Sequence, residues 1–364
     1  MEELSRLQDP WEKLVEQAAS ATVYQTWQWN SCWWRSFGHA HRLLLVTCYR
    51  GAELVGIAPM LRVGTEGGDT SGQGDIRFIG CPNNATDYPD FIVHPQAPEA
   101  LGILLDALVT ELRGYDRLWL TRYRDDFENR RRVLEWLRRN GAGFVSVPDL
   151  PAPYRKLGDP VADRRAASKA ALRRNFNHLR REGRLEFQVC KEPAEALNTL
   201  DAFFDQHVAR WAQTRWPSQF LQPDQRHFYR ELVPALMEHQ WLHFAVLRLD
   251  GAPIAFHFGF EHRNRLLYYK PAFDPRYAQF SPGKVLIKYL LEDLISRHLD
   301  EFDFTVGGEA YKYRFANAER LTHRIVVFRS RRASTMYRVQ QAVRQRVRGL
   351  RQNGRNILRR LQRL

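Results

Sequence analysis

The strongest constraint on the fold is a succession of segments that occurs twice along the 364-residue chain. Residues 43–63 are typical of two strands joined by a turn at Gly51, and residues 242–260 repeat this design with an Asp-Gly dipeptide ending at Gly251. The two turn glycines lie 200 positions apart. Each hairpin is followed by further strand-like sequence, a helix and a strand opened by an acid. These segments form a mixed α/β sheet unit, so the pattern predicts two such units.

The same pattern gives the bounds of the later segments in each unit. The crossover helices are expected at residues 97–113 and 283–298. The strands that follow them are expected at residues 116–123 and 300–306.

Two domains also fit the length of the chain, because 364 residues exceed the size at which a single core usually keeps growing. We place the first domain at residues 1–158, the second at 159–330 and a separate tail at 331–364. The second domain opens with two helices, which are expected at residues 160–182 and 193–211.

The basic charge of the chain is concentrated near its end. Residues 329–364 hold twelve arginines and no acid, and subtracting these twelve charges from the net charge of +14 leaves +2 for residues 1–328. Apolar residues recur there at spacings near three and four, which indicates an amphipathic helix with an arginine face. A solvated tail and a helix on an anionic membrane surface, formed by residues 334–364, both fit this pattern.

The remaining composition is typical of a cytoplasmic protein. The N-terminus lacks the basic and apolar regions of a secretory signal, and no apolar run approaches the ~20 residues that a membrane span needs. Four cysteines are scattered without metal-site spacing. We therefore expect a cytoplasmic protein without a metal, peripheral to the inner face of the membrane if its tail binds lipid.

One helix start in the second half is suited to binding anions. Within residues 268–294, a strand ends near Phe273 and a helix begins near Gly283, with Ser281 as its expected N-cap and Lys284 in its first turn. Backbone N–H groups and the helix dipole favour anions at such a position, and Lys284 adds a full charge. Ligands of α/β proteins bind on this carboxyl side of the sheet.

Ionisable and phenolic side chains gather just after the last strand of the second half. In DFTVGGEAYKYRFA (303–316), Asp303 opens the strand, two glycines break it, and Tyr311, Lys312 and Arg314 follow. A surface loop does not need this alternation of phenols and cations, so we interpret the segment as part of a ligand site. The alternative is that Asp303 caps the next segment and the two cations pair with surface acids.

The order of these features is similar to that of the CelD-like acetyltransferase family, which is associated with bacterial cellulose and exopolysaccharide synthesis. The matching positions follow one another through roughly residues 20–328, and they include Trp27, Trp33, Trp34, Gly51, Pro59, Gly80, Asp87, Tyr88, Leu172, Arg173, Arg174, His207, Arg210, Trp211, Gly251, Asp274, Gly283, Asp303, Phe304, Gly308, Tyr311, Lys312 and Arg314. That family resembles the GNAT-type acyltransferases and is related to the Fem-type peptidyltransferases, which have two GNAT-like domains and use aminoacyl-tRNA.

The resemblance implies an α/β fold of two tandem GNAT-like domains, with mixed β-sheets flanked by helices, plus the basic C-terminal helix. It implies acetyl-CoA or another acyl-CoA as co-substrate, held by Ser281, Gly283 and Lys284 where the fourth and fifth strands splay apart. The usual GNAT loop, Arg/Gln-x-x-Gly-x-Gly/Ala, is replaced here by Phe280-Ser-Pro-Gly-Lys284.

Direct acyl transfer to an amine or hydroxyl needs a base, a group that stabilises the oxyanion and an acid for the leaving thiolate. Tyr311 is the expected acid, and Lys312 or Arg314 is the expected source of positive charge. Asp303 is included with the catalytic candidates because it opens the fifth strand of the GNAT-like sheet.

Two residues are candidates for the base. Asp87, before Tyr88 near the end of a strand in the first half, is expected to project into the cleft between the domains, although an Asx-turn explains it equally well. His257, on the strand at residues 253–260, is the second candidate, and its alternative is a core histidine. The remaining candidates are expected to bind the acceptor: Tyr88, Arg173, Arg210, Tyr269 and Arg314.

Three classes of function follow. The first is an acyl-CoA-dependent N- or O-acyltransferase that acts on a polysaccharide precursor or sugar nucleotide. The second is a Fem-type aminoacyl transferase that uses charged tRNA, which the basic tail would help to hold. The third is a non-catalytic partner of a membrane glycan synthase.

Overall fold

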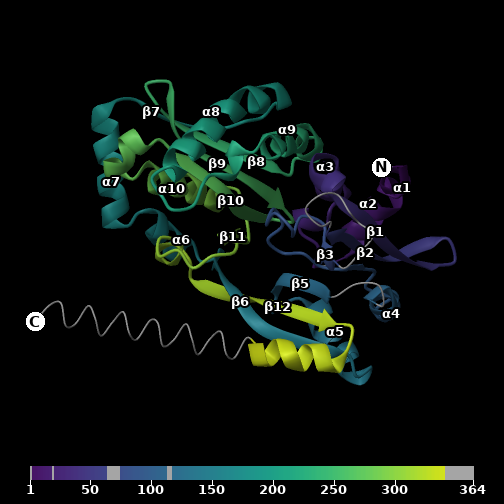
Figure 1. The fold of residues 1–364 in the computed structure, drawn as a ribbon. Helices are drawn as coiled ribbons and strands as arrows, with labels where there is room; N and C mark the ends of the chain where they lie inside the picture. Colours follow the sequence, from purple (N-terminus) through teal and green to yellow (C-terminus); the bar gives the residue numbers. More distant parts are fainter. Residues whose placement is uncertain (1, 19, 64–73, 113–116, 341–364) are drawn as a thin grey trace, which may run out of the picture.

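The computed structural model describes residues 2–18, 20–63, 74–112 and 117–340. Within them the strands are β1 His41–Arg50, β2 Glu53–Val63, β3 Asp75–Phe78, β4 Ile92–Val93, β5 Arg117–Arg124, β6 Gly143–Lys156, β7 Leu185–Val189, β8 Leu242–Leu249, β9 Ala252–His262, β10 Arg265–Phe273, β11 Glu301–Asp303 and β12 Ala318–Phe328. They form one mixed sheet in the order β1-β2-β3-β5-β12-β6-β11-β10-β9-β8-β7, with β4 paired to β2 (Figure 1).

Helices flank this sheet next to the strands of their own half. They are α1 Glu2–Arg6, α2 Gln8–Gln17, α3 Trp27–Phe37, α4 Ala100–Glu111, α5 Glu128–Arg139, α6 Pro160–Ala167, α7 Ala170–Glu182, α8 Pro193–Trp211, α9 Pro223–Met237 and α10 Pro282–Ser296. In the first half α4 packs on β1 and β2, and in the second half α10 packs on β9 and β10. Since α3 also packs on α9, helices of the two halves are in direct contact.

The two halves share the middle of the sheet. β6, from the first half, lies between β11 and β12 of the second, and β12 also pairs with β5. β6 can contain prolines inside the sheet because a proline lacks only the N–H donor and its carbonyl can still accept a hydrogen bond. The carbonyls of Pro151 and Pro153 accept hydrogen bonds from the N–H groups of Gly307 (2.8 Å) and Phe304 (3.1 Å). The proposed division of the chain at residue 158 stays a prediction.

Both predicted hairpins are confirmed. β1 pairs antiparallel with β2 and β8 with β9, and the turn residues Gly51 and Gly251 have φ angles of 60° and 80°. Glycine favours this left-handed conformation because it has no Cβ. The helices predicted at 97–113, 193–211 and 283–298 correspond to α4, α8 and α10.

Two predicted elements differ from the structure. The single helix expected at residues 160–182 is broken into α6 and α7, because Lys169 between them has an extended ψ of 142°. The strand expected at 300–306 ends with β11 at Asp303. The chain turns away there because Thr305 and Gly307 have positive φ angles of 55° and 122°.

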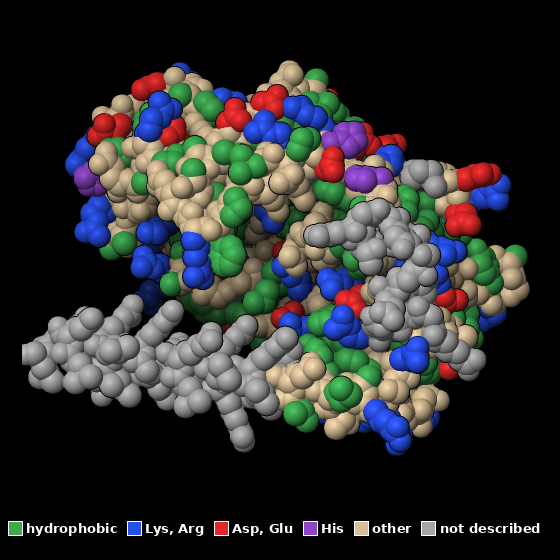
Figure 2. All heavy atoms as spheres, viewed as in Figure 1, with side chains coloured by type: hydrophobic (Ala, Val, Ile, Leu, Met, Phe, Trp, Pro, Cys, Tyr) green, Lys and Arg blue, Asp and Glu red, His purple; other side chains and the backbone are tan. Residues whose placement is uncertain are grey.

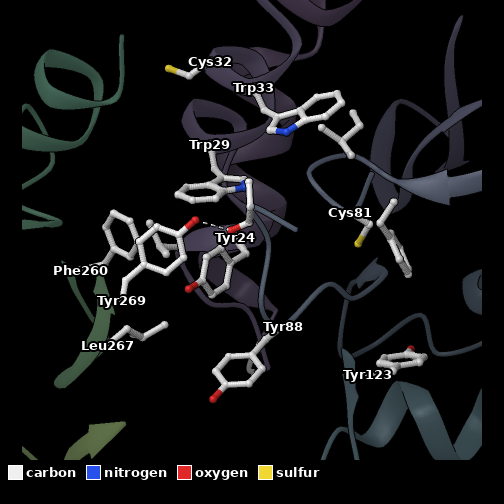
Figure 3. Close-up of a cluster of buried hydrophobic side chains, with 14 of the residues drawn as sticks. Tyr24, Trp29, Cys32, Trp33, Cys81, Tyr88, Tyr123, Phe260, Leu267 and Tyr269 are labelled. Carbon is white, nitrogen blue, oxygen red and sulfur yellow. Dashed lines mark hydrogen bonds between the residues drawn. The ribbon is translucent and has the colours of Figure 1, made fainter. Parts of the chain in front are cut away.

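An aromatic cluster joins the two halves near the start of the loop that follows β3 (Figure 3). Trp29 on α3 is fully buried and donates a hydrogen bond to Thr86 Oγ1 at 2.9 Å. Tyr269 on β10 packs edge-on against Trp29 and donates its hydroxyl hydrogen to the carbonyl of Ala85 at 2.6 Å. These contacts hold the loop that carries Asp87 against β10.

The described part of the tail is helical from Arg331 to Gln340. Its Tyr337 packs on Phe328 and Trp119, with ring centroids 5.1 and 6.3 Å away, whereas Met336 and Val339 are 64% and 59% exposed. The rest of the predicted basic helix, residues 341–364, lies outside the described residues. Among the described helices, none is long and apolar enough to cross a membrane.

Candidate active site

Two neighbouring cavities lie beside the end of β10, and the larger of them lies where the halves meet. We label them by the substrates that the sequence analysis predicts: the larger, the acceptor cavity, has a volume of about 440 Å³, and the smaller, the donor cavity, about 250 Å³. Four residues line both cavities: Arg210, Tyr268, Pro271 and Tyr311. Figure 2 shows the surface hollowed between the two parts of the molecule, with basic and acidic side chains within the hollow.

The donor cavity lies where two parallel strands separate. β10 pairs with β11 only over residues 265–267 and then continues to Phe273, while the chain leaves β11. The end of β10 and the start of α10 line the resulting space, and Ser281, Gly283 and Lys284 are among the lining residues. The three residues that the sequence assigned to the donor therefore share one cavity.

Ser281 precedes α10 as expected, but its side chain does not cap the helix. Its φ of 53° is left-handed, and its carbonyl instead accepts hydrogen bonds from the N–H groups of Lys284 (2.9 Å) and Val285 (3.3 Å). Two of the backbone donors at the helix start are thus already used. Among the described residues that line this cavity, Lys284 and Arg210 carry the positive charges available to an anionic ligand.

The acceptor cavity is lined by both halves of the chain. The first half supplies Asn83, Asn84, Asp87 and Arg122, and the second half supplies residues of α8, β10 and the segment after β11. Tyr311 and Lys312 line the same cavity as Asp87, although 224 positions separate Asp87 from Tyr311. The structure thus brings together the candidates that the sequence placed at one cleft.

Asp87 has a partner that the sequence did not reveal. Arg122 on β5 has a positive φ of 54°, at an irregularity in the pairing with β12, and this turns its side chain toward the loop after β3. Its Nη1 donates to Asp87 Oδ1 at 2.6 Å and to the carbonyls of Asn84 and Thr86 at 3.1 and 3.3 Å. The carboxylate is therefore one half of a partly buried ion pair rather than an isolated acid.

Lys312 is held in place in the acceptor cavity, next in sequence to Tyr311 at the junction. Lys312 is buried, and its Nζ donates to the carbonyl of Val306 at 2.8 Å and lies 2.9 Å from Glu309 Oε2. Burial, together with the nearby Glu309 carboxylate, raises the pKa of Tyr311. The phenol therefore stays protonated at neutral pH and can act as a proton donor.

Two further cations line the acceptor cavity, and sequence reasoning missed the first of them. Lys270 on β10 is partly buried, its Nζ lies 4.5 Å from the Tyr269 ring centroid, and burial lowers its pKa to about 8. Arg210 donates to the carbonyl of Pro271 at 3.2 Å and stacks on Phe273 at 4.7 Å. A lone lysine after two tyrosines carries no motif, so only the fold identifies Lys270 as a site residue.

Five predicted site residues do not line either cavity. Arg173 and Arg314 are exposed, on α7 and on the turn after Tyr311. His257 is fully buried and stacked on Tyr268 at 4.6 Å, and burial lowers its pKa well below the usual value. A buried, neutral imidazole out of reach of the cavities does not fit the role of base that the sequence suggested.

Tyr88 and Asp303 belong instead to a buried network behind the acceptor cavity. The Tyr88 hydroxyl donates to Asp303 Oδ1 at 2.8 Å, and Arg320 Nη1 donates to Asp303 Oδ2 at 3.3 Å. The Thr305 N–H also donates to Asp303 Oδ1 at 2.7 Å. This placement corrects the prediction that Asp303 is a catalytic residue, because its carboxylate binds Arg320 on β12 and lines neither cavity. No cluster of metal-binding side chains occurs among the residues described.

Residues 166–313 match the family described as "Acetyltransferase (GNAT) domain". This segment contains the whole donor cavity and the second-half side of the acceptor cavity. This part of the chain is thus similar to GNAT acetyltransferase domains, and the match supports an acyltransferase as the enzyme class. No curated protein matches the chain by sequence.

Solved structures share the fold over most of the chain. FemX superposes with a TM-score of 0.62 at 9% identity, covering 91% of this chain and 98% of FemX. L-PGS from Bacillus licheniformis superposes with a TM-score of 0.51 at 13% identity, covering 93% of this chain and 96% of its own. At such identities these likenesses show the fold alone, and they agree with the predicted mixed α/β architecture.

Proposed function

We propose that the chain transfers an acyl group from acyl-CoA directly to an amine or hydroxyl of a polysaccharide precursor or sugar nucleotide. The observation that carries this proposal is the junction of the two cavities at Tyr311. A donor bound at the start of α10 and an acceptor bound between the halves would meet there. Such a shared junction supports direct transfer, which needs both substrates at one point.

Residues of the acceptor cavity supply the chemistry of this step. The acceptor nitrogen or oxygen attacks the thioester carbonyl, its proton passes to the Asp87 carboxylate, and the carbon–sulfur bond breaks. Tyr311 gives its proton to the leaving thiolate. Lys312 uses two of its three N–H donors on the protein, so one remains for the developing oxyanion.

The runner-up is an aminoacyl-tRNA-dependent transferase of the Fem type. The likeness to FemX over 91% of this chain favours it, as does the basic tail. If the chain is instead a non-catalytic partner of a glycan synthase, the third class, it should bind neither acetyl-CoA nor tRNA. Calorimetry with acetyl-CoA tests the first class, and a gel shift with total tRNA at physiological salt tests the second, because low salt exaggerates binding of RNA by basic tails.

Replacing Lys284 by glutamate is expected to weaken acetyl-CoA binding by ~1–3 kcal/mol, because a charge-assisted contact is replaced by repulsion. Isothermal calorimetry measures the change. The matched control is Lys13→Glu, which makes the same charge change at an exposed position on α2 that lines neither cavity. Equal affinity in the Lys284 variant and the unaltered protein would remove the donor assignment.

We also propose that the basic tail attaches the protein to anionic membrane surfaces. Truncation after Gln340 removes eight of the twelve arginines and keeps the contacts of Tyr337. Each arginine near an anionic leaflet contributes about 1 kcal/mol at most. The shortened protein should keep its melting temperature but stop co-sedimenting with phosphatidylglycerol vesicles. A melting temperature lowered by several degrees would show instead that residues 341–364 support the folded body.

A further inference from the structure

The charges around the acceptor cavity do not balance within the protein. Four cations line it, Arg122, Arg210, Lys270 and Lys312, against two acids, Asp87 and Glu309. Both acids are already engaged, Asp87 with Arg122 and Glu309 with Lys312. Among the described residues, no carboxylate forms an ion pair with Lys270 or Arg210, and Asp87, which is itself paired with Arg122, acts on Lys270 only at longer range, so two positive charges line the cavity without a direct counter-ion.

Lys270 is the more unusual of the two. Its side chain is partly buried, and its Nζ lies 4.5 Å from the centroid of the Tyr269 ring rather than against a carboxylate. A buried charge is costly unless an opposite charge or hydrogen-bond acceptors compensate it. Arg210 is oriented by the carbonyl of Pro271 and the ring of Phe273, which leaves its remaining N–H donors for a ligand.

Buried hydrogen-bond donors around the cavity lack partners as well. Asn83 Nδ2 and Trp211 Nε1 are the unpartnered buried side-chain atoms among the described lining residues, and both carry hydrogen. The orientation of the Asn83 amide is fixed, because its Oδ1 accepts from Trp33 Nε1 at 3.0 Å and from the Ala85 N–H at 3.3 Å. The cavity thus offers unpaired donors and positive charge.

We propose, on the basis of the function above, that Lys270 and Arg210 recognise an anionic, oxygen-rich group of the acceptor, either a phosphate or a carboxylate. Such a group supplies both the missing negative charge and the missing acceptors. A neutral sugar would supply acceptors alone and leave two cations uncompensated. The acceptor class is therefore narrowed to phosphorylated or acidic precursors.

Calorimetry with inorganic pyrophosphate and with sodium glucuronate tests this proposal and tells the two anions apart. We expect one of these probes to bind, Lys270→Met and Arg210→Gln each to lower its affinity at least tenfold, and Lys270→Arg to restore most of it. Lys13→Met on α2 is the matched control and should bind as the unaltered protein does. Unchanged affinity in both cavity variants, or no binding of either probe, overturns the proposal.

Repeating the titration with the protein saturated with acetyl-CoA separates the acceptor from the donor. The probe should still bind, because it occupies a different cavity. If acetyl-CoA displaces it, the anion site belongs to the donor and the proposal fails while the proposed function stands. If acetyl-CoA itself does not bind, the proposed function fails, and probe binding that still depends on Lys270 keeps the anion site.

Discussion

Replacing Arg320 by leucine is expected to lower the free energy of unfolding by about 3–5 kcal/mol, since it removes one partner of a buried ionic network. Arg320 on β12 is 9% exposed and donates to Glu301 (2.9 Å), Asp303 (3.3 Å) and Asp126 (2.9 Å). Its guanidinium also stacks on Tyr154 of β6 at 3.7 Å. Without it, the buried carboxylates of Glu301 and Asp303 on β11 lose their ion-pair partner.

Urea unfolding measures this loss, and Arg131→Leu on α5 is the matched control. Arg131 likewise pairs with two carboxylates, Glu128 and Glu135, but all three side chains are largely exposed. Solvent screens such pairs, so its replacement should change stability little. If the two substitutions lower the free energy of unfolding equally, burial does not explain how the Arg320 network stabilises the protein.

Replacing Tyr311 by phenylalanine is expected to lower kcat roughly 100-fold, the lower end of the range for loss of a general acid. The substitution removes only the hydroxyl, so the walls of both cavities and the affinity for acetyl-CoA should be preserved. Thiol release from acetyl-CoA measures the rate, and calorimetry measures the affinity.

Tyr313→Phe provides the control for this variant. Tyr313 lies two positions further along the same segment, is exposed and donates its hydroxyl hydrogen to Glu319. Its hydroxyl lines neither cavity, so the rate should stay within a few-fold of the unaltered protein. Equal losses in the two variants would assign the effect to the turn as a whole rather than to the phenol at the junction.

The elements that the sequence predicted correctly carry their own local signals. The hairpins at Gly51 and Gly251 have turn residues that require positive φ, and α8 and α10 begin with a proline in the first turn. β6 carries no such signal. Its prolines argue against an internal strand, because they cannot donate hydrogen bonds to a neighbouring strand. Only the structure shows that their carbonyls still accept hydrogen bonds, from the N–H groups of Phe304 and Gly307.

Part of the site could also be predicted from local sequence signals. Ser281, Gly283 and Lys284 are contiguous with a helix start, so a local pattern places them. Asp303 could not be assigned from sequence, because its orientation depends on Arg320, which arrives on another strand. Lys270 and Arg122 were missed because their importance depends on residues from other parts of the chain. Arg122 forms an ion pair with Asp87, whereas none of the described carboxylates pairs with Lys270.

The position of β6 limits how this protein can be assembled and divided. β12 pairs with β5 across roughly 200 positions of sequence, a separation typical of slow-forming contacts. Until residues 318–328 emerge from the ribosome, β5 and β6 each lack the neighbour that β12 provides. Unpaired edges invite association with other chains. The halves are therefore not interchangeable modules, and an evolutionary exchange of one half would have to carry compatible β6 and β12 together.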